Sequence, residues 1–315
     1  MNISISIIIP TYNRAHLLGE TLEGILAQTY PHWECLVVDD GSTDDTPLLM
    51  ESYTQNDARI QYLHRPKDRP KGANAARNYG FEQCKGEWVQ WFDSDDLLLP
   101  TYLEIKQKAI TKDPTLDFVV SRTLNMQEGE HFHIDKYEGN LKHPLNFKNY
   151  LTEKVYWMTP DFMTKRELLH KVDFDETLRS AQETNFFLKF LLQNPQAKGT
   201  FIDQEVTLRR MHPGSIQGAV QQDKQQASMQ KLYSLMAAYK ECVQVVTKEE
   251  EGMLLNKLIP LAYYIAKKNT FRKDRSFLMQ RLRKTKGWKK LIAFQVSLFL
   301  RKWKKGYSLM NYARN

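Results

Sequence analysis

The stretch Trp91-Phe92-Asp93-Ser94-Asp95-Asp96 decides the fold of this chain, because an apolar run leads directly into three carboxylates. The residues from Glu87 to Phe92 are rich in aromatic and β-branched types, which predicts a strand that enters the core. Clustered carboxylates repel one another unless a cation neutralises them, and a hard divalent cation prefers oxygen ligands, including those of substrate phosphates. Since ligands of open α/β sheets bind at the carboxyl ends of the strands, this stretch predicts a nucleotide-phosphate site.

The same acidic residues also fit a turn that caps a helix. Asp and Ser are common in both positions, and Leu97-Leu98-Leu99-Pro100 follows as if a helix began there. Taken alone, the stretch favours the turn, because short acidic clusters are frequent in loops. The other motifs of the N-terminal half decide between the two interpretations.

The length and composition indicate a globular protein without a membrane span. At 315 residues, the chain can form one large domain, or a domain with a substantial appendage, and its hydrophobic content is 42%. Its three cysteines match no metal-ligand spacing, so we expect buried free thiols and a reducing compartment. The N-terminus lacks the basic region of a signal peptide, and the longest apolar run, residues 291–300, is too short to cross a bilayer. We therefore expect a cytoplasmic protein.

The net charge of +8 is distributed unevenly along the chain. Residues 270–315 contain 14 Lys and Arg against one acidic residue, whereas residues 1–269 carry a net charge of −5. The basic charge therefore belongs to the tail, and a mildly acidic body argues against nucleic-acid binding by the whole protein.

Short β-rich runs alternate with half-buried helical patterns through the first hundred residues. This alternation with short connections predicts a Rossmann-like α/β fold, a mostly parallel sheet flanked by helices on both faces. The expected strands are 3–9, 33–38, 59–64 and 87–92, and the expected helices are 15–28, 46–53 and 71–84.

The alternation becomes less regular after Pro100. The expected elements are a strand at 116–121, half of an edge hairpin at 131–137, a helix at 181–193 and one or two strands within 200–208. From about residue 221 onward the pattern is helical. We therefore expect an α/β domain over residues 1–218 and a helical region with a basic tail over residues 219–315.

Two motifs follow the first and second predicted strands. In Pro10-Thr11-Tyr12-Asn13-Arg14, the aromatic ring can stack on a nucleobase and the arginine can reach phosphate, although a buried tyrosine in a turn fits equally well. In Val37 to Asp45, Asp40 can bind a base or ribose while Asp44 caps a helix.

A further motif, Lys71 to Gly80, opens the helix that precedes the acidic strand end. Its small residues allow close packing on the sheet, and Arg77 lies where it can face a nucleotide. The alternative is a well-packed helix with a solvated arginine. Four motifs in this order, each at a strand-to-helix junction on one rim of a sheet, are hard to explain as turns alone.

These motifs resemble those of the family-2 glycosyltransferases, which are nucleotide-sugar-dependent enzymes with a GT-A fold. The resemblance is strong over residues 3–100, continues more faintly to about residue 218, and covers none of the C-terminal helices. It implies metal-dependent transfer of a sugar, with inversion, from a nucleoside diphosphate sugar such as a UDP-sugar to a hydroxyl acceptor. The implied pathway is the assembly of cell-surface polysaccharide or glycan. The segments that carry it are 7–14, 37–44, 72–80 and 92–96.

The resemblance also assigns roles to individual residues. The side chains that would hold the base and the nucleotide are those of Pro10, Thr11, Tyr12, Arg14, Asp40 and Arg77. Asp93 and Ser94 would lie beside the ribose and the diphosphate. Asp95 would ligate Mn²⁺ or Mg²⁺ between the two phosphates, and Asp96 would support the loop.

The catalytic base of such enzymes is commonly the Asp of a Glu-Asp or Gln-Asp pair at a helix start, and Glu183 falls in that position. A carboxylate there can take the proton of the acceptor hydroxyl as it attacks the anomeric carbon. The sequence departs from the pattern, with Glu for Asp and with Thr184-Asn185 where an aromatic-acidic pair is common. Asp175 and Glu176 compete for the role, and a solvent-facing Glu near a helix N-terminus is the structural alternative. His212 would approach the metal or the diphosphate.

Basic residues and tryptophans flank the apolar run 291–300. A helix of this kind suits an anionic membrane surface, or it packs as a buried helix on the α/β domain or on a partner. The expected acceptor is a glycan or a lipid-linked molecule. The rival functions are a nucleotide-sugar-binding or scaffolding subunit that has lost its base, and nucleic-acid binding by the tail, which the acidic body disfavours.

Overall fold

The computed structural model describes residues 3–211, 224–265, 272–303 and 305–315. His212 and the expected boundary at residue 218 lie outside the described residues. All three cysteines are buried and free, as predicted. Among the helices of the described residues, none combines the length and apolarity needed to cross a bilayer.

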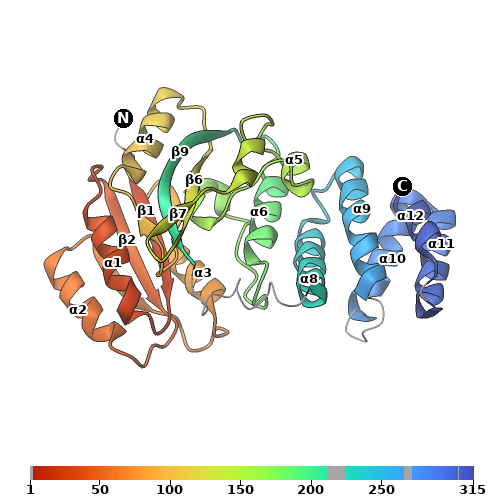
Figure 1. Ribbon diagram of the computed structural model, residues 1–315, viewed down its shortest axis with the longest axis horizontal. Helices are drawn as coiled ribbons and strands as arrows, with labels where there is room; N and C mark the ends of the chain where they lie inside the picture. Colours follow the sequence, from red (N-terminus) through yellow and green to blue (C-terminus); the bar gives the residue numbers. More distant parts are fainter. Residues whose placement is uncertain (1–2, 212–223, 266–271, 304) are drawn as a thin grey trace.

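A single mixed sheet forms the centre of the N-terminal two thirds of the chain (Figure 1). Its strand order is β3-β2-β1-β4-β8-β6-β9-β5, with β7 paired to β6. The first four strands are mutually parallel, and β8 is inserted antiparallel between β4 and β6. The strands are β1 (Ile5–Thr11), β2 (Trp33–Asp39), β3 (Ile60–His64), β4 (Trp88–Trp91), β5 (Leu97–Leu98), β6 (Phe118–Gln127), β7 (Glu130–Phe132), β8 (Phe162–Lys165) and β9 (Gly199–Arg210).

Helices cover both faces of the sheet, because strands such as β1 bury alternate side chains on opposite sides. Ile7 and Ile9 face a core shared with α1, α2 and α4, whereas Ile8 faces a core shared with α3, α5 and α6. A Cβ placed on Gly80 of α3 would lie 2.4 Å from Ile8 Cγ2, so the predicted close packing of this helix requires glycine. The helices are α1 (Ala15–Leu26), α2 (Thr46–Asn56), α3 (Ala73–Gln83), α4 (Tyr102–Lys112), α5 (Phe147–Leu151) and α6 (Gln182–Gln193).

The α/β fold class is confirmed, and the elements that differ from expectation lie after the acidic strand end. Leu97-Leu98 does not begin a helix but pairs with Leu208 and Thr207 of β9, and α4 starts only at Tyr102. The strand β8 was not predicted. These residues adopt strand structure because partners distant in sequence complete the sheet, which outweighs local preference.

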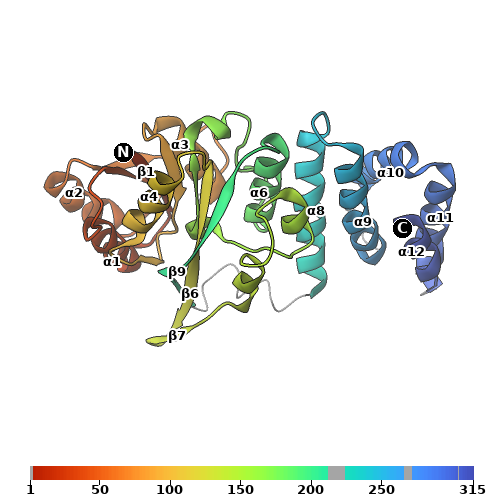
Figure 2. The same cartoon turned by 90° about the horizontal axis from the view of Figure 1, so that it is seen from above.

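The C-terminal region is entirely helical in its described residues. It comprises α8 (Lys224–Cys242), α9 (Lys248–Ile265), α10 (Arg272–Lys286), α11 (Trp288–Leu300) and α12 (Tyr307–Arg314). Helix α8 packs against α6, and the later helices follow one another away from the sheet along the long axis of the molecule (Figures 1 and 2).

Buried polar side chains hold this region to the sheet-bearing part. Lys189 of α6 donates hydrogen bonds of 2.7 Å to both Asp173 and Glu241, the second of which lies on α8. Ser234 of α8 donates its hydroxyl to the carbonyl of Ala181, at 2.8 Å, immediately before α6. Ala181 adopts the left-handed conformation, with φ of 53°. Helix α8 is therefore in direct contact with the backbone that starts α6.

Candidate functional site

The acidic strand end follows β4, and each of its three carboxylates has a different partner. Asp93 Oδ1 accepts a hydrogen bond of 2.7 Å from Arg77, while Asp95 Oδ2 lies 3.7 Å from Arg14 Nε. Asp96 is buried, and its Oδ1 accepts the backbone N–H of Arg210 at 3.0 Å. The side chains of Asp93 and Asp95 remain 35% and 23% exposed, so only these two carboxylates can reach a ligand.

Asp96 supports the loop from inside the protein. Burial, followed by the charges of Asp93 and Asp95, raises the pKa of the Asp96 carboxyl well above its usual value. The Thr21 hydroxyl of α1 hydrogen-bonds to the carbonyls of Asp96, at 2.8 Å, and of Ser94, at 3.2 Å. These contacts fix the loop against α1.

Arg77 is buried and links the strand end to the start of α6. Besides Asp93, its guanidinium donates to Gln182 Oε1 at 3.0 Å and to Asn74 Oδ1 at 3.3 Å. The solvated arginine considered from the sequence is therefore wrong. The interactions join three segments that are far apart in the chain, and Gln182 directly precedes Glu183.

The loops after β1 and β2 are tied to each other. Asn13, with φ of 51°, accepts the N–H of Thr43 at 2.8 Å and donates its own N–H to Ser42 at 2.9 Å. Tyr12 next to it is 42% exposed, and Lys71 Nζ lies 4.0 Å from its ring centroid. The alternative of a buried tyrosine is therefore excluded, and part of the Tyr12 side chain is exposed at this rim.

The paired carboxylates after β2 have separate roles. Asp39 accepts hydrogen bonds from the N–H groups of Gly41 and Ser42, at 3.1 and 2.8 Å, so it shapes its own loop. Asp40 is ion-paired with Arg65, whose guanidinium also donates to the carbonyls of Pro66 and Arg69 at 2.7 and 2.6 Å. Sequence reasoning missed Arg65, although its position just after the third predicted strand was a usable signal.

Pro10 and Thr11 end β1 at the same rim, and both are buried. The Thr11 hydroxyl oxygen is buried without a hydrogen-bond partner among the described residues. An unpaired buried hydroxyl is unusual, because its desolvation is costly. It therefore offers one polar atom to a ligand at the end of β1.

Glu183 lies in the first turn of α6, where the backbone of a separate turn holds its carboxylate. Glu183 Oε1 accepts the N–H of Thr159 at 2.8 Å and the Thr159 hydroxyl at 2.6 Å. The competing carboxylates have other partners, since Asp175 accepts from Thr177 at 2.9 and 2.6 Å and Glu176 accepts from Asn78 at 3.0 Å.

The turn that holds Glu183, residues Thr159–Asp161, rests on a buried polar network that sequence reasoning missed. Asp161 accepts hydrogen bonds from the Thr123 hydroxyl at 2.6 Å, the Tyr137 hydroxyl at 2.5 Å and the Met158 N–H at 2.7 Å. The ammonium group of Lys106, on α4, donates to the Asp161 carbonyl at 2.8 Å.

Burial governs the charges in this network. It raises the pKa of the Asp161 carboxyl to about 6, against the three hydrogen bonds that lower it, and it lowers the pKa of Lys106 well below its usual value. Thr123 lies 38 residues from Asp161 in the sequence, and Lys106 lies 55 residues from it. No local sequence pattern therefore indicates the network.

The strand end suits a cation that shares its coordination with a ligand. Within the described ranges, no three His, Cys, Asp or Glu side chains converge on a point that could hold a metal ion. Asp93 and Asp95 supply two partly exposed carboxylates, and hard cations accept such oxygens together with phosphate oxygens. The donor set therefore fits a metal bound jointly with a diphosphate.

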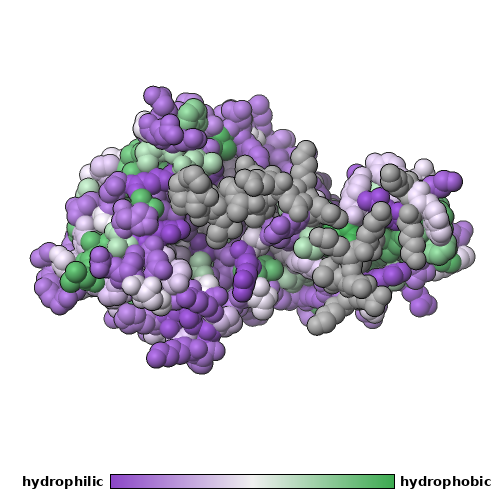
Figure 3. Space-filling model, turned by 60° about the horizontal axis from the view of Figure 1, so that its bottom comes forward, coloured by the Kyte–Doolittle hydropathy of each residue, from purple (hydrophilic) through white to green (hydrophobic). Residues whose placement is uncertain are grey.

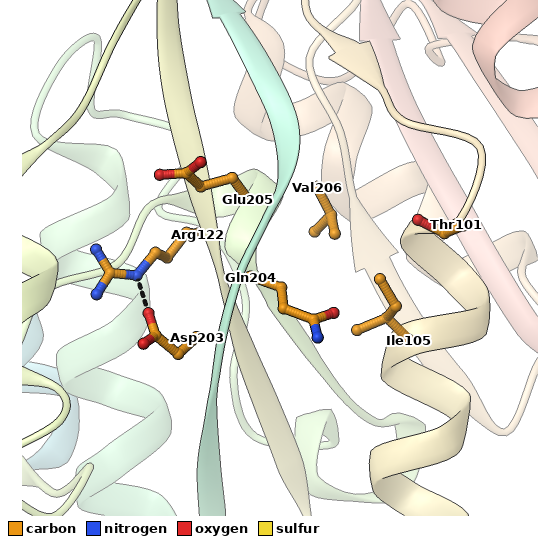
Figure 4. A pocket seen from close by; sticks show the side chains of 7 residues that line it. All are labelled: Thr101, Ile105, Arg122, Asp203, Gln204, Glu205 and Val206. Carbon is orange, nitrogen blue, oxygen red and sulfur yellow. Dashed lines mark hydrogen bonds and ion pairs between the residues drawn. The ribbon is translucent and has the colours of Figure 1, made fainter.

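A pocket of about 480 Å³ lies elsewhere, along β9 near the start of α4 (Figure 4). The side chains of Asp203 and Glu205 lie on one side of the strand, and those of Gln204 and Val206 lie on the other. None of the predicted nucleotide-sugar residues lines it. Of its charged side chains, Arg122 is paired with Asp203 and with Glu138.

Comparison with protein families and curated proteins gives a consistent result. Residues 6–173 match the model of the family described as Glycosyl transferase family 2. The chain is 29% identical over 232 residues to the glycosyltransferase GlyG of Streptococcus pneumoniae serotype 4, covering 67% of this chain and 72% of GlyG. An uncharacterized glycosyltransferase of Rickettsia felis is 30% identical over 217 residues, covering 67% of this chain but only 33% of that protein.

A shorter match and two solved structures add to these relatives. TuaG of Bacillus subtilis, named as a candidate teichuronic acid biosynthesis glycosyltransferase, is 34% identical over 119 residues, 38% of this chain and 43% of TuaG. The structure of Staphylococcus aureus TarS 1–349 with UDP-GlcNAc has a TM-score of 0.67 and 18% identity, covering 98% of this chain and 90% of TarS 1–349. The mannosyltransferase PcManGT of Pyrobaculum calidifontis, in complex with GDP-Man and Mn²⁺, has a TM-score of 0.58 and 18% identity, covering 99% and 86%. The structural likeness confirms the GT-A fold.

Proposed function

We propose that this chain, which belongs to glycosyl transferase family 2, transfers a sugar from a nucleoside diphosphate sugar to a hydroxyl acceptor with inversion of configuration. The observation that carries the proposal is the buried Arg77, which connects Asp93 at the strand end to Gln182 beside Glu183. It supports a single site in which the donor diphosphate and the base are held on one rim.

The donor lies across the ends of β1, β2 and β4 in this proposal. Tyr12 stacks on the base, with Pro10 and Thr11 beneath it, and Asp40 accepts a hydrogen bond from the base while Arg65 fixes its orientation. A pyrimidine base with an imide N–H group, as in UDP, matches a carboxylate acceptor. Structures of TarS with UDP and UDP-GlcNAc support the choice of UDP-sugar.

The diphosphate lies at the acidic strand end. Arg14, 3.7 Å from Asp95, is close enough to this end to reach a phosphate oxygen. Arg77 orients Asp93, and the Asp93-Ser94 segment passes beside the ribose and the diphosphate.

Asp95 would hold the metal, Mn²⁺ or Mg²⁺, and His212, which lies outside the described residues, would be a second ligand. When bound, such an ion neutralises charge on the diphosphate leaving group. The complex of PcManGT with GDP-Man and Mn²⁺ supports a divalent cation.

Glu183 acts as the general base. The acceptor oxygen forms a bond to the anomeric carbon, the bond from that carbon to the diphosphate oxygen breaks, and the hydroxyl proton moves to Glu183. The Thr159 N–H and hydroxyl engage Glu183 Oε1, while Oε2 makes no hydrogen bond or ion pair with the described residues. An attack opposite the leaving group inverts the anomeric configuration.

The proposed acceptor is a glycan or a lipid-linked glycan, in cell-surface polysaccharide assembly on the cytoplasmic side of the membrane. The name of TuaG, which refers to teichuronic acid biosynthesis, supports this pathway. The proposed class of acceptor rests on the similarity to TuaG.

The test compares Glu183→Gln with the unchanged protein in donor binding and in turnover. We expect the variant to keep its thermal shift with UDP and Mn²⁺, because the amide oxygen still accepts from Thr159, but to lose about a thousandfold in transfer rate. Thr184→Ala, next to it on α6, serves as the matched control.

The rival function is a nucleotide-sugar-binding or scaffolding subunit, and the Glu at position 183 in place of the usual Asp is the observation that favours it. UDP binding without turnover on any acceptor or on water, unchanged by Glu183→Gln, would establish the rival and end the catalytic proposal.

A further inference from the structure

Helix α11 and the turn Arg301–Trp303 after it expose a continuous apolar surface at the end of the molecule most distant from the sheet (Figure 1). Five large side chains spaced by three or four residues are between 41% and 61% exposed. This spacing places them in one line along the helix. We refer to them as the apolar stripe: Trp288, Ile292, Val296, Phe299 and Trp303.

The opposite face of α11 is the one that packs. Ala293, Phe294, Ser297 and Leu298 are buried against the neighbouring helices. The sequence shows apolar residues almost all round this helix, and the structure separates them into an inner face and an exposed one. Figure 3 shows hydrophobic residues on the outer surface at this end of the molecule. The apolar stripe therefore does not contribute to the packed core. A contiguous exposed apolar surface of this kind is unusual on a monomeric soluble protein.

The charges around the stripe are of one sign. Residues 275–315 contain 12 Lys and Arg and no Asp or Glu. Arg283, Lys284 and Lys289 are exposed near its first tryptophan, and Lys305 is exposed near its last. Two acidic residues lie nearby: Asp274, the nearest along the chain, is ion-paired with Lys240, and Glu251 of α9, which accepts a hydrogen bond from Thr285, is buried and ion-paired with Arg281.

Exposed aromatic side chains also occur on α12, which packs against α11. Tyr307 and Tyr312 are 54% and 49% exposed, and Lys290 lies with its ammonium group 3.6 Å from the Tyr312 ring centroid. Aromatic rings with a polar edge, placed beside basic side chains, are typical of a membrane-water interface.

We propose that the apolar stripe binds the surface of an anionic lipid bilayer, with α11 lying in the interface plane. Ile292, Val296 and Phe299 enter the boundary of the acyl chains, while the two tryptophans and the flanking lysines contact the head-group layer. The helix lies on the bilayer and does not cross it, in agreement with the absence of a span among the described helices.

Charge decides between this occupant and two others. A second copy of this chain would bring two basic surfaces together, which is unfavourable. A nucleic acid would use the basic side chains but would leave the aliphatic part of the stripe in water. An anionic bilayer accommodates both the apolar and the basic groups, so it fits the surface best.

The experiment measures co-sedimentation of the full chain with vesicles of phosphatidylcholine, with and without phosphatidylglycerol. We expect binding to the anionic vesicles, weakened by salt, and about tenfold weaker binding for Trp288→Ser with Trp303→Ser. Lys284→Gln with Lys289→Gln should weaken binding only to the anionic vesicles. Leu48→Ser, which removes an apolar side chain 68% exposed on α2, and Lys112→Gln on α4 are the matched controls.

Several outcomes would overturn the proposal. They are no sedimentation with anionic vesicles, equal binding by the tryptophan variant, binding to duplex DNA that competes with vesicles, or a dimer in light scattering that the tryptophan variant abolishes. The melting temperature and the thermal shift with UDP and Mn²⁺ should stay unchanged in every variant. This separates loss of the membrane surface from failure of the proposed transfer reaction, on which this inference does not depend.

Discussion

The two sides of the candidate site are built in different ways. The donor side, at the ends of β1, β2 and β4, consists of partly exposed loop residues such as Tyr12, Asp93 and Asp95. The side that holds Glu183 depends on a turn supported by Asp161 and by the fully buried network around it. Side chains on the donor side can be substituted without disturbing the core, whereas substitutions on the side that holds Glu183 disturb it. The comparison predicts that substitutions on the donor side mainly affect activity, and that substitutions around Asp161 mainly affect folding.

The largest effect is expected for Asp95→Ala. Loss of the proposed metal ligand should lower kcat/KM by about a thousandfold, equivalent to about 4 kcal/mol, and should abolish the dependence on Mn²⁺. The free energy of unfolding should change by less than about 1 kcal/mol, because the ion pair of a partly exposed carboxylate contributes little to stability. The pair in question joins Asp95 to Arg14 at 3.7 Å. The measurement is steady-state kinetics with and without Mn²⁺, and Asp45→Ala, an exposed aspartate of the same rim, is the control. Activity that keeps its metal dependence in Asp95→Ala contradicts the proposed mechanism.

The next effect is expected for Asp161→Ala, and it concerns folding. The substitution leaves the Thr123 hydroxyl, the Tyr137 hydroxyl and the Met158 N–H without their acceptor in the core. We expect the free energy of unfolding to fall by about 3 kcal/mol, measured by urea denaturation. Asp113→Ala, an exposed aspartate that caps its own turn, should cost less than about 1 kcal/mol. Equal losses in the two variants would remove the distinction between the two sides.

Arg77→Met tests the connection between the sides. It removes the bonds to Asp93 and Gln182 together, so we expect kcat/KM to fall about thirtyfold, or about 2 kcal/mol. The donor KM should rise and kcat should fall, because both the diphosphate end and the start of α6 lose their position. Arg59→Met, which removes a local pair with Asp57, should leave both constants unchanged. A change in KM alone would confine Arg77 to the donor side.

The smallest effect concerns pH. The folded-state pKa of Asp161 is about 6, above the ordinary value of 3.8, because burial disfavours the charged form. The stability that Asp161 contributes is therefore fully present below pH 3.8 and is lost as the pH rises to about 6. We expect the unfolding free energy of the unchanged protein, minus that of Asp161→Asn, to fall across this range and then to level off. A difference that rises with pH would mean that hydrogen bonding to the ionised carboxylate outweighs burial.

The sequence predicted the strands and helices of the donor side because these elements are local in the chain. The motifs after β1 and β2 each consist of a strand followed within a few residues by a loop and a helix start. The acidic strand end differs, because it leads into β5 before α4 begins. Arg65 could have been found by the same rule. The roles proposed for Asp40 and Asp95 nevertheless came from resemblance to a family, and they remain predictions.

The rest of the site depends on pairings between residues that are distant in the chain. The strand β8 is completed by β4 and β6, and Lys106 is buried only because Gln90, Tyr102 and Asp161 converge on it. On α11, apolar residues surround the helix, so periodicity alone could not distinguish the packed face from the exposed apolar stripe. Such features are determined by tertiary contacts, and a single sequence does not display them.

The bond from Ser234 to the carbonyl of Ala181 has a practical consequence for anyone who shortens this protein. A fragment ending near residue 218 would retain every motif that resembles the family, yet it would lack α8. The left-handed residue before α6 would then lose its hydroxyl donor, and the α6 side chains that face α8 would meet water. An inactive fragment of that kind would say nothing about the enzyme, so the shortest useful version extends at least through Cys242.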